Sequence, residues 1–459
     1  MKFPYTFVAF LLMATSVLSA QKKEVSLEEI WSGSFRQERL QSLQSLNNGE
    51  EYVVMNRDRE TGTVSIDIYS YKTGKKTRTL LNSKDLTEIK SFQSFKFSED
   101  ESKILLSTEI EPIYRRSSRE VVHIYDVASK KLTKVSDDKI QEASFSPDNS
   151  KLAYVFENNI YILDLKSMER TQVTMDGEIN SIINGITDWV YEEEFSFVKA
   201  FAWNPTGEKI AYLRFDESAV PEFSMDLFGK YLYPTQQVFK YPKAGESNSE
   251  VSLHMYDVEA NSSEEIKLGD YADFYIPRIK WSSKDMLLSV QVLNRHQNNL
   301  DLIFVNAENN KASVVLNETD KAYVDITDNL TFLEDNSFIW TSEKDGWNHI
   351  YHYAEDGKLI NQITSGQWEV TNYYGYDKKA KRIYFQSTEN GSVNRDVYAI
   401  KPNGKSKTRL TEKDGTNSAD FSADYTYFIN TFTNVNTPPV YTLHKAKDGK
   451  QVREILNNN

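Results

Sequence analysis

The 459-residue sequence contains no cysteine. Disulfide bonds, thiol catalysis, thiolate metal sites and lipidation of an N-terminal cysteine are therefore excluded, and stability must come from the core alone. Basic residues are also in deficit, with 54 Lys and Arg against 67 Asp and Glu, which gives a formal net charge of −13. Because nucleic acids and anionic membranes are polyanions, this balance argues against either as the main partner. Beyond residue 20 no apolar run is long enough to span a bilayer, so we predict no membrane span in the mature chain.

The first 20 residues show the order of features that is typical of a cleaved secretory signal peptide. Lys2 supplies a positive charge, an apolar stretch covers residues 7–17, and small residues end at Ser19 and Ala20. The apolar stretch is too short to cross a bilayer comfortably. A buried N-terminal element is the alternative, but the order of the features favours a signal peptide over residues 1–20. We therefore expect an exported protein, either periplasmic or extracellular.

A short helix is predicted directly after the signal peptide. Ser26 followed by Glu29 forms a capping box, and the apolar residues up to Phe35 have roughly helical spacing. We expect a helix from about Ser26 to Arg36, inside an N-terminal helical segment that covers residues 21–46.

The remainder of the chain repeats two strand motifs. The first is an aromatic residue, a polar turn and a strand, as in residues 145–155 (FSPDNSKLAYV). The second is an alternating hydrophobic strand, which occurs eight times, at residues 66–71, 123–127, 161–165, 254–258, 302–305, 350–353, 397–400 and 440–443. Repeats of roughly 35 to 50 residues with about four short strands each are the signature of a β-propeller. Paired β-sandwiches are the alternative, but a sandwich has no reason to repeat one motif in this way. We predict an all-β, eight-bladed β-propeller over residues 47–459.

The fourth repeat carries an insertion, from about residue 182 to residue 252, that contains an acidic run. Residues 188–194 read DWVYEEE and are followed by Phe195. Adjacent like charges repel each other and aromatic neighbours lower the local dielectric, so such carboxylates favour a small cation, for example an ammonium group. A solvated acidic run on the surface, which is common in a protein of this net charge, is the alternative.

The acidic run resembles the glutamate motif of the dipeptidyl peptidase IV family. The similarity continues through three further landmarks, at residues 203–207 (WNPTG), 215–221 (FDESAVP) and 241–245 (YPKAG). Weaker similarity covers most of the chain after the signal peptide, and eight blades is the number found in the family's propeller. The resemblance implies that the acidic run is functional.

This resemblance implies roles for three residues. Glu193 and Glu194 match the pair of glutamates that binds the free α-amino group of the substrate peptide. Arg115, in the run YRRS at residues 114–117, matches the propeller arginine that contacts the P2 carbonyl; a solvated hairpin tip is the alternative. The chemistry suits an exopeptidase, because the chain end is marked by an ammonium of pKa about 8 and two carboxylates bind it by charge-assisted hydrogen bonds. A closed acidic end also rejects longer N-terminal extensions.

Two further features concern partners and cofactors. Residues 231–252 are similar to the family's extended arm at the homodimer contact, so a homodimer through this arm is expected; a mobile surface loop is the alternative. His349 and His352 lie three apart on a predicted strand and therefore point to opposite faces. No carboxylate cluster completes a metal site around them, and we predict neither a metal nor a cofactor.

The sequence lacks the nucleophile motif that the family's hydrolysis requires. The Gly-x-Ser sequences at 245–247 and 404–406 have no closing glycine, and His444 is the only histidine in the C-terminal stretch. We therefore expect the α/β-hydrolase domain to be absent from this chain and assign no catalytic residue. The resemblance implies the substrate-recognition propeller of an exported serine-type dipeptidyl peptidase that releases X-Pro or X-Ala dipeptides from peptide N-termini. A stand-alone periplasmic propeller that acts as a binding or interaction module is the alternative.

Overall fold

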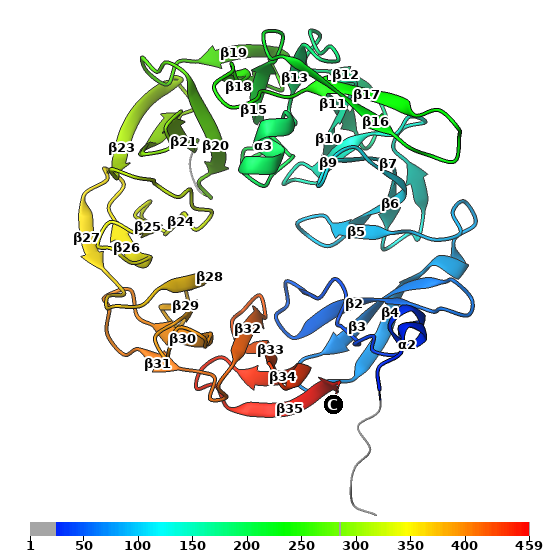
Figure 1. Cartoon of the computed structure of the whole chain (residues 1–459), viewed down its shortest axis with the longest axis vertical. Helices are drawn as coiled ribbons and strands as arrows, with labels where there is room; N and C mark the ends of the chain where they lie inside the picture. The colour runs from blue at the N-terminus through cyan, green and yellow to red at the C-terminus, as the bar shows by residue number, and fades with distance from the viewer. Residues whose placement is uncertain (1–23, 284–285, 459) are drawn as a thin grey trace, which may run out of the picture.

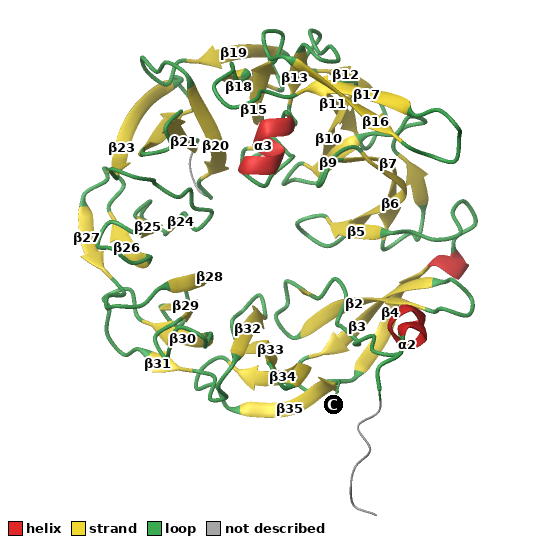
Figure 2. Cartoon of the chain, in the orientation of Figure 1, coloured by secondary structure: helices red, strands yellow, loops and turns green. Residues whose placement is uncertain are grey.

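Eight antiparallel β-sheets follow one another around a ring (Figure 1). The computed structural model describes residues 24–283 and 286–458, which are almost entirely strands and turns (Figure 2). This arrangement confirms the predicted all-β, eight-bladed β-propeller. The predicted signal peptide, residues 1–20, lies outside the described residues.

Each blade is one contiguous stretch of the chain, and its strands run in sequence order from the centre of the ring outward. Blades 1 to 4 contain β1 (Gln44–Ser45), β2 (Glu51–Arg57), β3 (Val64–Ser70), β4 (Lys76–Asn82); β5 (Ser94–Phe97), β6 (Lys103–Pro112), β7 (Ser118–Asp126), β8 (Leu132–Lys134); β9 (Gln141–Phe145), β10 (Lys151–Phe156), β11 (Asn159–Asp164), β12 (Arg170–Gln172); and β13 (Ile182–Asn184), β14 (Phe201–Trp203), β15 (Lys209–Asp216), β18 (Glu250–Asp257), β19 (Ser262–Ile266). Blades 5 to 8 contain β20 (Phe274–Trp281), β21 (Leu287–Asn294), β22 (Asn299–Asn306), β23 (Lys311–Thr319); β24 (Thr331–Phe332), β25 (Phe338–Ser342), β26 (His349–Tyr353), β27 (Leu359–Gln362); β28 (Val370–Asp377), β29 (Arg382–Ser387), β30 (Asp396–Ile400), β31 (Thr408–Arg409); and β32 (Thr416–Phe421), β33 (Tyr427–Asn434), β34 (Thr437–Lys445), β35 (Gln451–Asn457).

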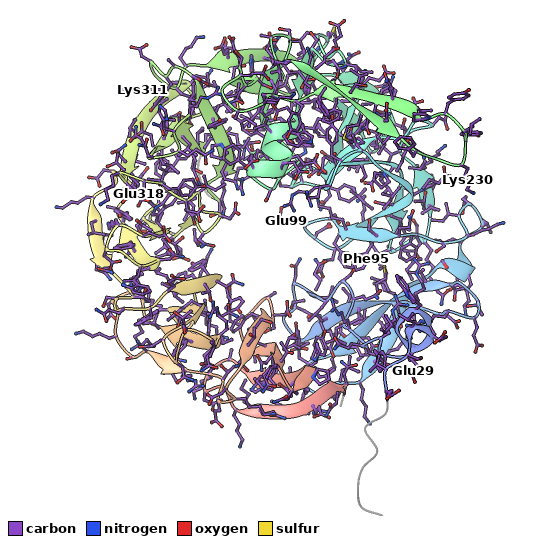
Figure 3. All side chains as sticks on the ribbon, viewed as in Figure 1. Glu29, Phe95, Glu99, Lys230, Lys311 and Glu318 are labelled. Atoms are coloured by element: carbon purple, nitrogen blue, oxygen red, sulfur yellow. The ribbon has the colours of Figure 1, made fainter. Side chains whose placement is uncertain are left out.

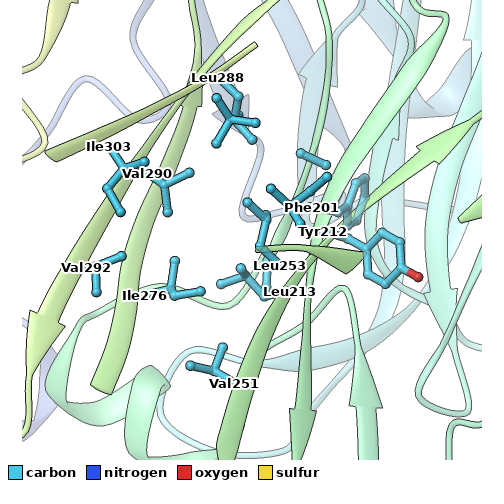
Figure 4. Close-up of a cluster of buried hydrophobic side chains, with 14 of the residues drawn as sticks. Phe201, Tyr212, Leu213, Val251, Leu253, Ile276, Leu288, Val290, Val292 and Ile303 are labelled. Atoms are coloured by element: carbon cyan, nitrogen blue, oxygen red, sulfur yellow. The ribbon is translucent and has the colours of Figure 1, made fainter. Parts of the chain in front are cut away.

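The core lies between neighbouring blades, whose faces pack on one another. Leu213 and Leu253 of blade 4 pack in one cluster with Ile276 and Val290 of blade 5 (Figure 4). Because the middle strands are covered on both faces, several of them are buried along their whole length, as β25 and β30 are. Each blade therefore depends on its neighbours to cover its apolar surface.

The first repeated motif forms a turn that is held by a buried serine. In blade 3 the Ser146 hydroxyl donates to the Asp148 carboxylate at 2.5 Å and accepts from the backbone N–H of Lys151 at 3.0 Å. The same turn recurs at Ser98 in blade 2 and at Ser422 in blade 8. The repeat seen in the sequence therefore has a physical cause, because the serine satisfies backbone and carboxylate groups at the start of a buried strand.

The N-terminal helix α2 (Leu27–Ser32) is shorter than the predicted helix from Ser26 to Arg36. The capping box is confirmed, since the Ser26 hydroxyl accepts from the Glu29 backbone N–H at 3.1 Å and the Glu29 carboxylate accepts from the Ser26 N–H at 3.3 Å. Gly33, with φ of 80°, ends the helix in the left-handed conformation that favours glycine. None of the helices in the described residues is long and apolar enough to cross a membrane.

The ring closes where blade 8 meets blade 1. The first blade begins at Gln44, inside the predicted helical segment and before the predicted propeller boundary at residue 47. The Arg453 guanidinium on β35 donates to the carbonyl oxygens of Lys72 and Thr73 in blade 1. Apolar residues of both blades pack in one cluster at this seam, namely Tyr52, Val54, Tyr71, Ile429, Tyr441 and Leu443. No strand is exchanged between the two sheets in the described residues, so the ring is closed by side-chain packing and by hydrogen bonds in which one partner is a side chain.

Candidate functional site

A short helix, α3 (Trp189–Glu194), projects from blade 4 toward the centre of the ring (Figure 2). The innermost position of this blade is shared by β13 and β14, which both pair with β15, and α3 is inserted between them. The helix contains most of the acidic run and was not predicted from the sequence. Asp188 is the signal that could have indicated it, because its carboxylate caps the helix by accepting from the Tyr191 backbone N–H at 2.9 Å.

Buried contacts fix α3 to the propeller. The Ser249 hydroxyl donates to the other oxygen of the Asp188 carboxylate at 2.5 Å, and burial raises the pKa of Asp188. The Tyr191 ring packs against Phe195, Phe215 and Tyr275, with centroids 4.8 to 5.9 Å apart. The Tyr191 hydroxyl accepts from the Ile276 backbone N–H of blade 5 at 2.9 Å. The orientation of α3 therefore depends on blades 4 and 5 together.

The three consecutive glutamates of α3 have different surroundings. The Glu192 side chain is buried, that of Glu193 is half-buried, and that of Glu194 is exposed. Among the described residues, no hydrogen bond or ion pair involves the Glu194 carboxylate. The three glutamates of the acidic run are therefore not equally solvated, and only Glu194 is classed as exposed to solvent.

Arg115 of blade 2 contacts Glu193 of blade 4. The Arg115 Nε donates to Glu193 Oε2 at 2.7 Å, from the tip of the β6–β7 hairpin in blade 2 to the helix of blade 4. The arginine side chain is 70% exposed and the glutamate side chain 17% exposed. The Glu193 carboxylate raises the pKa of Arg115. The structure thus brings Arg115 and Glu193 into contact, with Glu194 on the same helix.

A family model described as the dipeptidyl peptidase IV (DPP IV) N-terminal region matches residues 98–439. The chain belongs to this family. Dipeptidyl peptidase 4 of Trichophyton rubrum is 30% identical over 390 residues, which cover 81% of this chain and 50% of the fungal protein. Dipeptidyl peptidase 4 of Porphyromonas gingivalis, a crystal structure, superposes with a TM-score of 0.90 at 40% identity, covering 95% of this chain and 62% of that one. The chain therefore spans about half the length of the curated relatives it matches.

In this dipeptidyl peptidase IV region, an aromatic cavity lies beside the Arg115–Glu193 pair. Its volume is about 700 Å³, and its walls include Arg115, Glu193 and five aromatic residues, namely Tyr114, Trp189, Phe223, Phe239 and Tyr241. The hairpin of β16 (Glu222–Leu227) and β17 (Thr235–Lys240) forms one wall. The arm expected at residues 231–252 is therefore a hairpin that begins earlier, at Glu222, while residues from Glu250 belong to blade 4.

A third buried acid, Glu217, lies close to the site. Burial raises the pKa of Glu217 to about 8, and the neighbouring Asp188 carboxylate acts in the same direction. Burial also raises the pKa of Tyr114 to about 12, with Glu217, Glu192 and Asp188 contributing. Glu217 lies in the FDESAVP landmark, but no sequence pattern indicates that its carboxyl group is buried. Three buried acids, Asp188, Glu192 and Glu217, therefore lie close to Tyr114, which precedes Arg115.

Proposed function

We propose that this propeller recognises the substrate of a serine-type dipeptidyl peptidase that releases X-Pro or X-Ala dipeptides. The enzyme is proposed to be exported, and to be either periplasmic or extracellular. The observation that carries the proposal is the ion pair between Arg115 and Glu193 next to the exposed Glu194. Two carboxylates and one guanidinium carry a net charge of −1, which complements the single positive charge of a peptide's α-ammonium.

The two glutamates and the arginine have different proposed roles. Glu193 and Glu194 accept hydrogen bonds from the ammonium, and Arg115 donates to the P2 carbonyl. The described contacts of Arg115 involve only its Nε, so both Nη groups remain available as donors. A peptide whose amino group is acetylated has neither the charge nor the full set of donors that the two carboxylates require.

The bond-breaking groups are proposed to lie outside these 459 residues. A serine, an aspartate and a histidine would supply them, as in other hydrolases of this type. The match to only about half the length of the curated relatives is consistent with that division. In this proposal the propeller measures the distance from the chain end and the catalytic groups cut.

We expect the tripeptide Ala-Pro-Gly to bind the 459-residue chain more tightly than its N-acetylated form. Hydrogen bonds to charged groups contribute about 1.5 to 3 kcal/mol each, which corresponds to roughly 10- to 100-fold in Kd. Isothermal titration calorimetry measures both peptides, and Glu194→Gln is expected to remove most of the difference.

Glu308→Gln is the matched control, because it removes the same charge from an exposed turn of blade 5. It is expected to bind both peptides as the wild type does. Equal affinity of the wild type for the free and the acetylated peptide would contradict the proposed role of the two glutamates.

We also propose that the β16–β17 hairpin forms a homodimer contact. Its tip exposes Phe228, Tyr231, Leu232 and Tyr233, with Leu232 90% exposed. Figure 3 shows Lys230 at the outer end of this hairpin, away from the ring. Exposed apolar side chains that project together are typical of a protein interface, and the proposed partner is a second copy of the chain.

Sedimentation velocity tests the dimer. We expect the wild type to sediment as a dimer at micromolar concentration, and Leu232→Asp to sediment as a monomer because a charge would be buried in the contact. Lys230→Ala, on the same loop, is the control and should remain dimeric. A monomeric wild type over this concentration range would rule out the contact.

A further inference from the structure

Glu192, the first of the three consecutive glutamates, binds backbone rather than solvent. Its side chain is 1% exposed. Its Oε1 accepts from the backbone N–H of Arg116 at 2.5 Å and from that of Ser117 at 2.9 Å. A carboxylate oxygen that is buried and already accepts from two N–H donors has little capacity left for a ligand. Glu192 therefore differs in kind from Glu193 and Glu194, although the three are adjacent in the sequence.

The side chain of Arg116 makes the return contacts. Its Nε donates to the backbone carbonyl oxygen of Glu192 at 3.3 Å, and its Nη2 donates to the Ser196 hydroxyl at 2.9 Å. The hairpin tip and α3 are thus joined in both directions. We call these four hydrogen bonds between Arg116, Ser117, Glu192 and Ser196 the latch.

The latch joins two blades that are not neighbours. Residues 113–117 lie between β6 and β7 of blade 2, whereas α3 belongs to blade 4, and blade 3 stands between them. Within the tip, Ile113 N–H donates to the Ser117 carbonyl at 2.8 Å and Tyr114 N–H to the Ser117 hydroxyl at 3.3 Å. The N–H groups of Arg116 and Ser117 are the ones that point to Glu192. The tip consequently takes its position from α3 as well as from its own strands.

Arg115 immediately precedes the latched residue. Its side chain is mostly exposed, so packing does little to fix it, and a free arginine side chain has large rotamer freedom. A backbone held at Arg116 and Ser117 restricts where the guanidinium can reach and favours its contact with Glu193. The latch thereby sets the distance between the groups that would hold the ammonium and the group that would hold the carbonyl.

We propose that Glu192 is a positioning residue that acts through Arg115, and that it is not a third ligand of the ammonium. This proposal rests on the proposed function, because it assumes that Arg115 contacts the substrate. The charge of Glu192 matters, since a neutral amide accepts hydrogen bonds more weakly than a carboxylate. Glu192→Gln keeps the size of the side chain, weakens the latch and removes a negative charge that also acts on Arg115.

A double-mutant cycle tests the proposal with the Ala-Pro-Gly probe on the 459-residue chain. We expect Glu192→Gln to weaken binding about tenfold and Arg115→Ala to weaken it at least as much. In the Arg115→Ala background, Glu192→Gln is expected to have no further effect, because the group that it positions is gone. A purely structural role would instead weaken both backgrounds equally.

Hydrogen exchange of the segment 113–118 provides a second readout that does not depend on binding. The N–H groups of Arg116 and Ser117 should be protected in the wild type and in Arg115→Ala, and should exchange faster in Glu192→Gln. If Glu192→Gln does not fold, Arg116→Ala replaces it, because that exposed side chain makes only the return contacts of the latch.

The outcomes separate this proposal from the proposed function. An equal loss in both backgrounds, or no effect of Glu192→Gln while Arg115→Ala weakens binding, would overturn the positioning role and leave the function of Arg115 standing. Unchanged binding by Arg115→Ala would overturn the proposed role of Arg115 itself, and the positioning role with it.

Discussion

Replacing Tyr191 with alanine is expected to lower the free energy of unfolding by about 3 to 5 kcal/mol, the usual cost of removing a buried aromatic ring. The ring is almost fully buried and packs against Phe195, Phe215 and Tyr275. Since it also anchors α3, the same variant is expected to lose binding of the free-amine peptide. Urea unfolding followed by tryptophan fluorescence measures the first effect and calorimetric titration the second.

Tyr191→Phe separates the ring from its hydroxyl. This variant keeps the aromatic packing and removes only the acceptor of the Ile276 N–H, which is expected to cost about 1 to 3 kcal/mol. If the alanine and phenylalanine variants were equally destabilised, the packing of the ring would not be what holds α3.

Glu217 is expected to make the protein less stable as the pH rises. Burial raises its pKa in the folded state to about 8, above the reference value of 4.5. Between these values the folded state binds the proton that the unfolded state has released, so the stabilisation is fully present below pH 4.5 and is lost as the pH rises toward 8. The expected loss is roughly 3 to 5 kcal/mol over this window.

The comparison with Glu217→Gln isolates this effect. The charged groups that act on Glu217 are Asp188 and Asp216, which raise its pKa, and Lys240, which lowers it. All three are retained in the variant, so the difference in unfolding free energy between the two proteins reports mainly on Glu217. Chemical unfolding at pH 5, 6, 7 and 8 should show the wild type losing stability relative to the variant. A constant difference across these pH values would show that the carboxyl group ionises as it does in water.

The number of blades could be predicted from the sequence because the repeated motifs have local causes. The Ser146 turn satisfies its hydrogen bonds within a few residues, so its pattern is visible in a single stretch of sequence. The N-terminal helix was predicted from its start, since the Ser26 capping box is local. Its end was placed too late, because Gly33 stops the helix before the apolar spacing does.

The helix that carries the candidate site could not be predicted in the same way. Residues 189–194 are too few to establish a helical period, and the contacts that hold them come from distant segments. Tyr191 bonds to Ile276, and Glu192 bonds to a turn that is 75 and 76 positions away. The charge pattern drew attention to the acidic run, but only the resemblance to a family singled out Glu193, Glu194 and Arg115, and no local pattern indicated that Glu192 is buried.

The arm was located only in part. The resemblance drew attention to residues 231–252, whereas the hairpin pairs Glu222–Leu227 with Thr235–Lys240. The alternation of Phe223, Met225 and Leu227 with polar residues was a strand signal ahead of the expected range. Sequence similarity thus identified the region, and strand periodicity would have given its boundaries.

The one-segment-per-blade architecture bears on how such a ring can change in evolution. Where each unit contacts only its neighbours, a gene can gain or lose a unit by duplicating or deleting one segment. Blade 3 is an exception, because the contacts between blades 2 and 4 pass over it and require that one blade, and no more, lies between them. Changes in blade number should therefore be tolerated at other places in the ring before they are tolerated there.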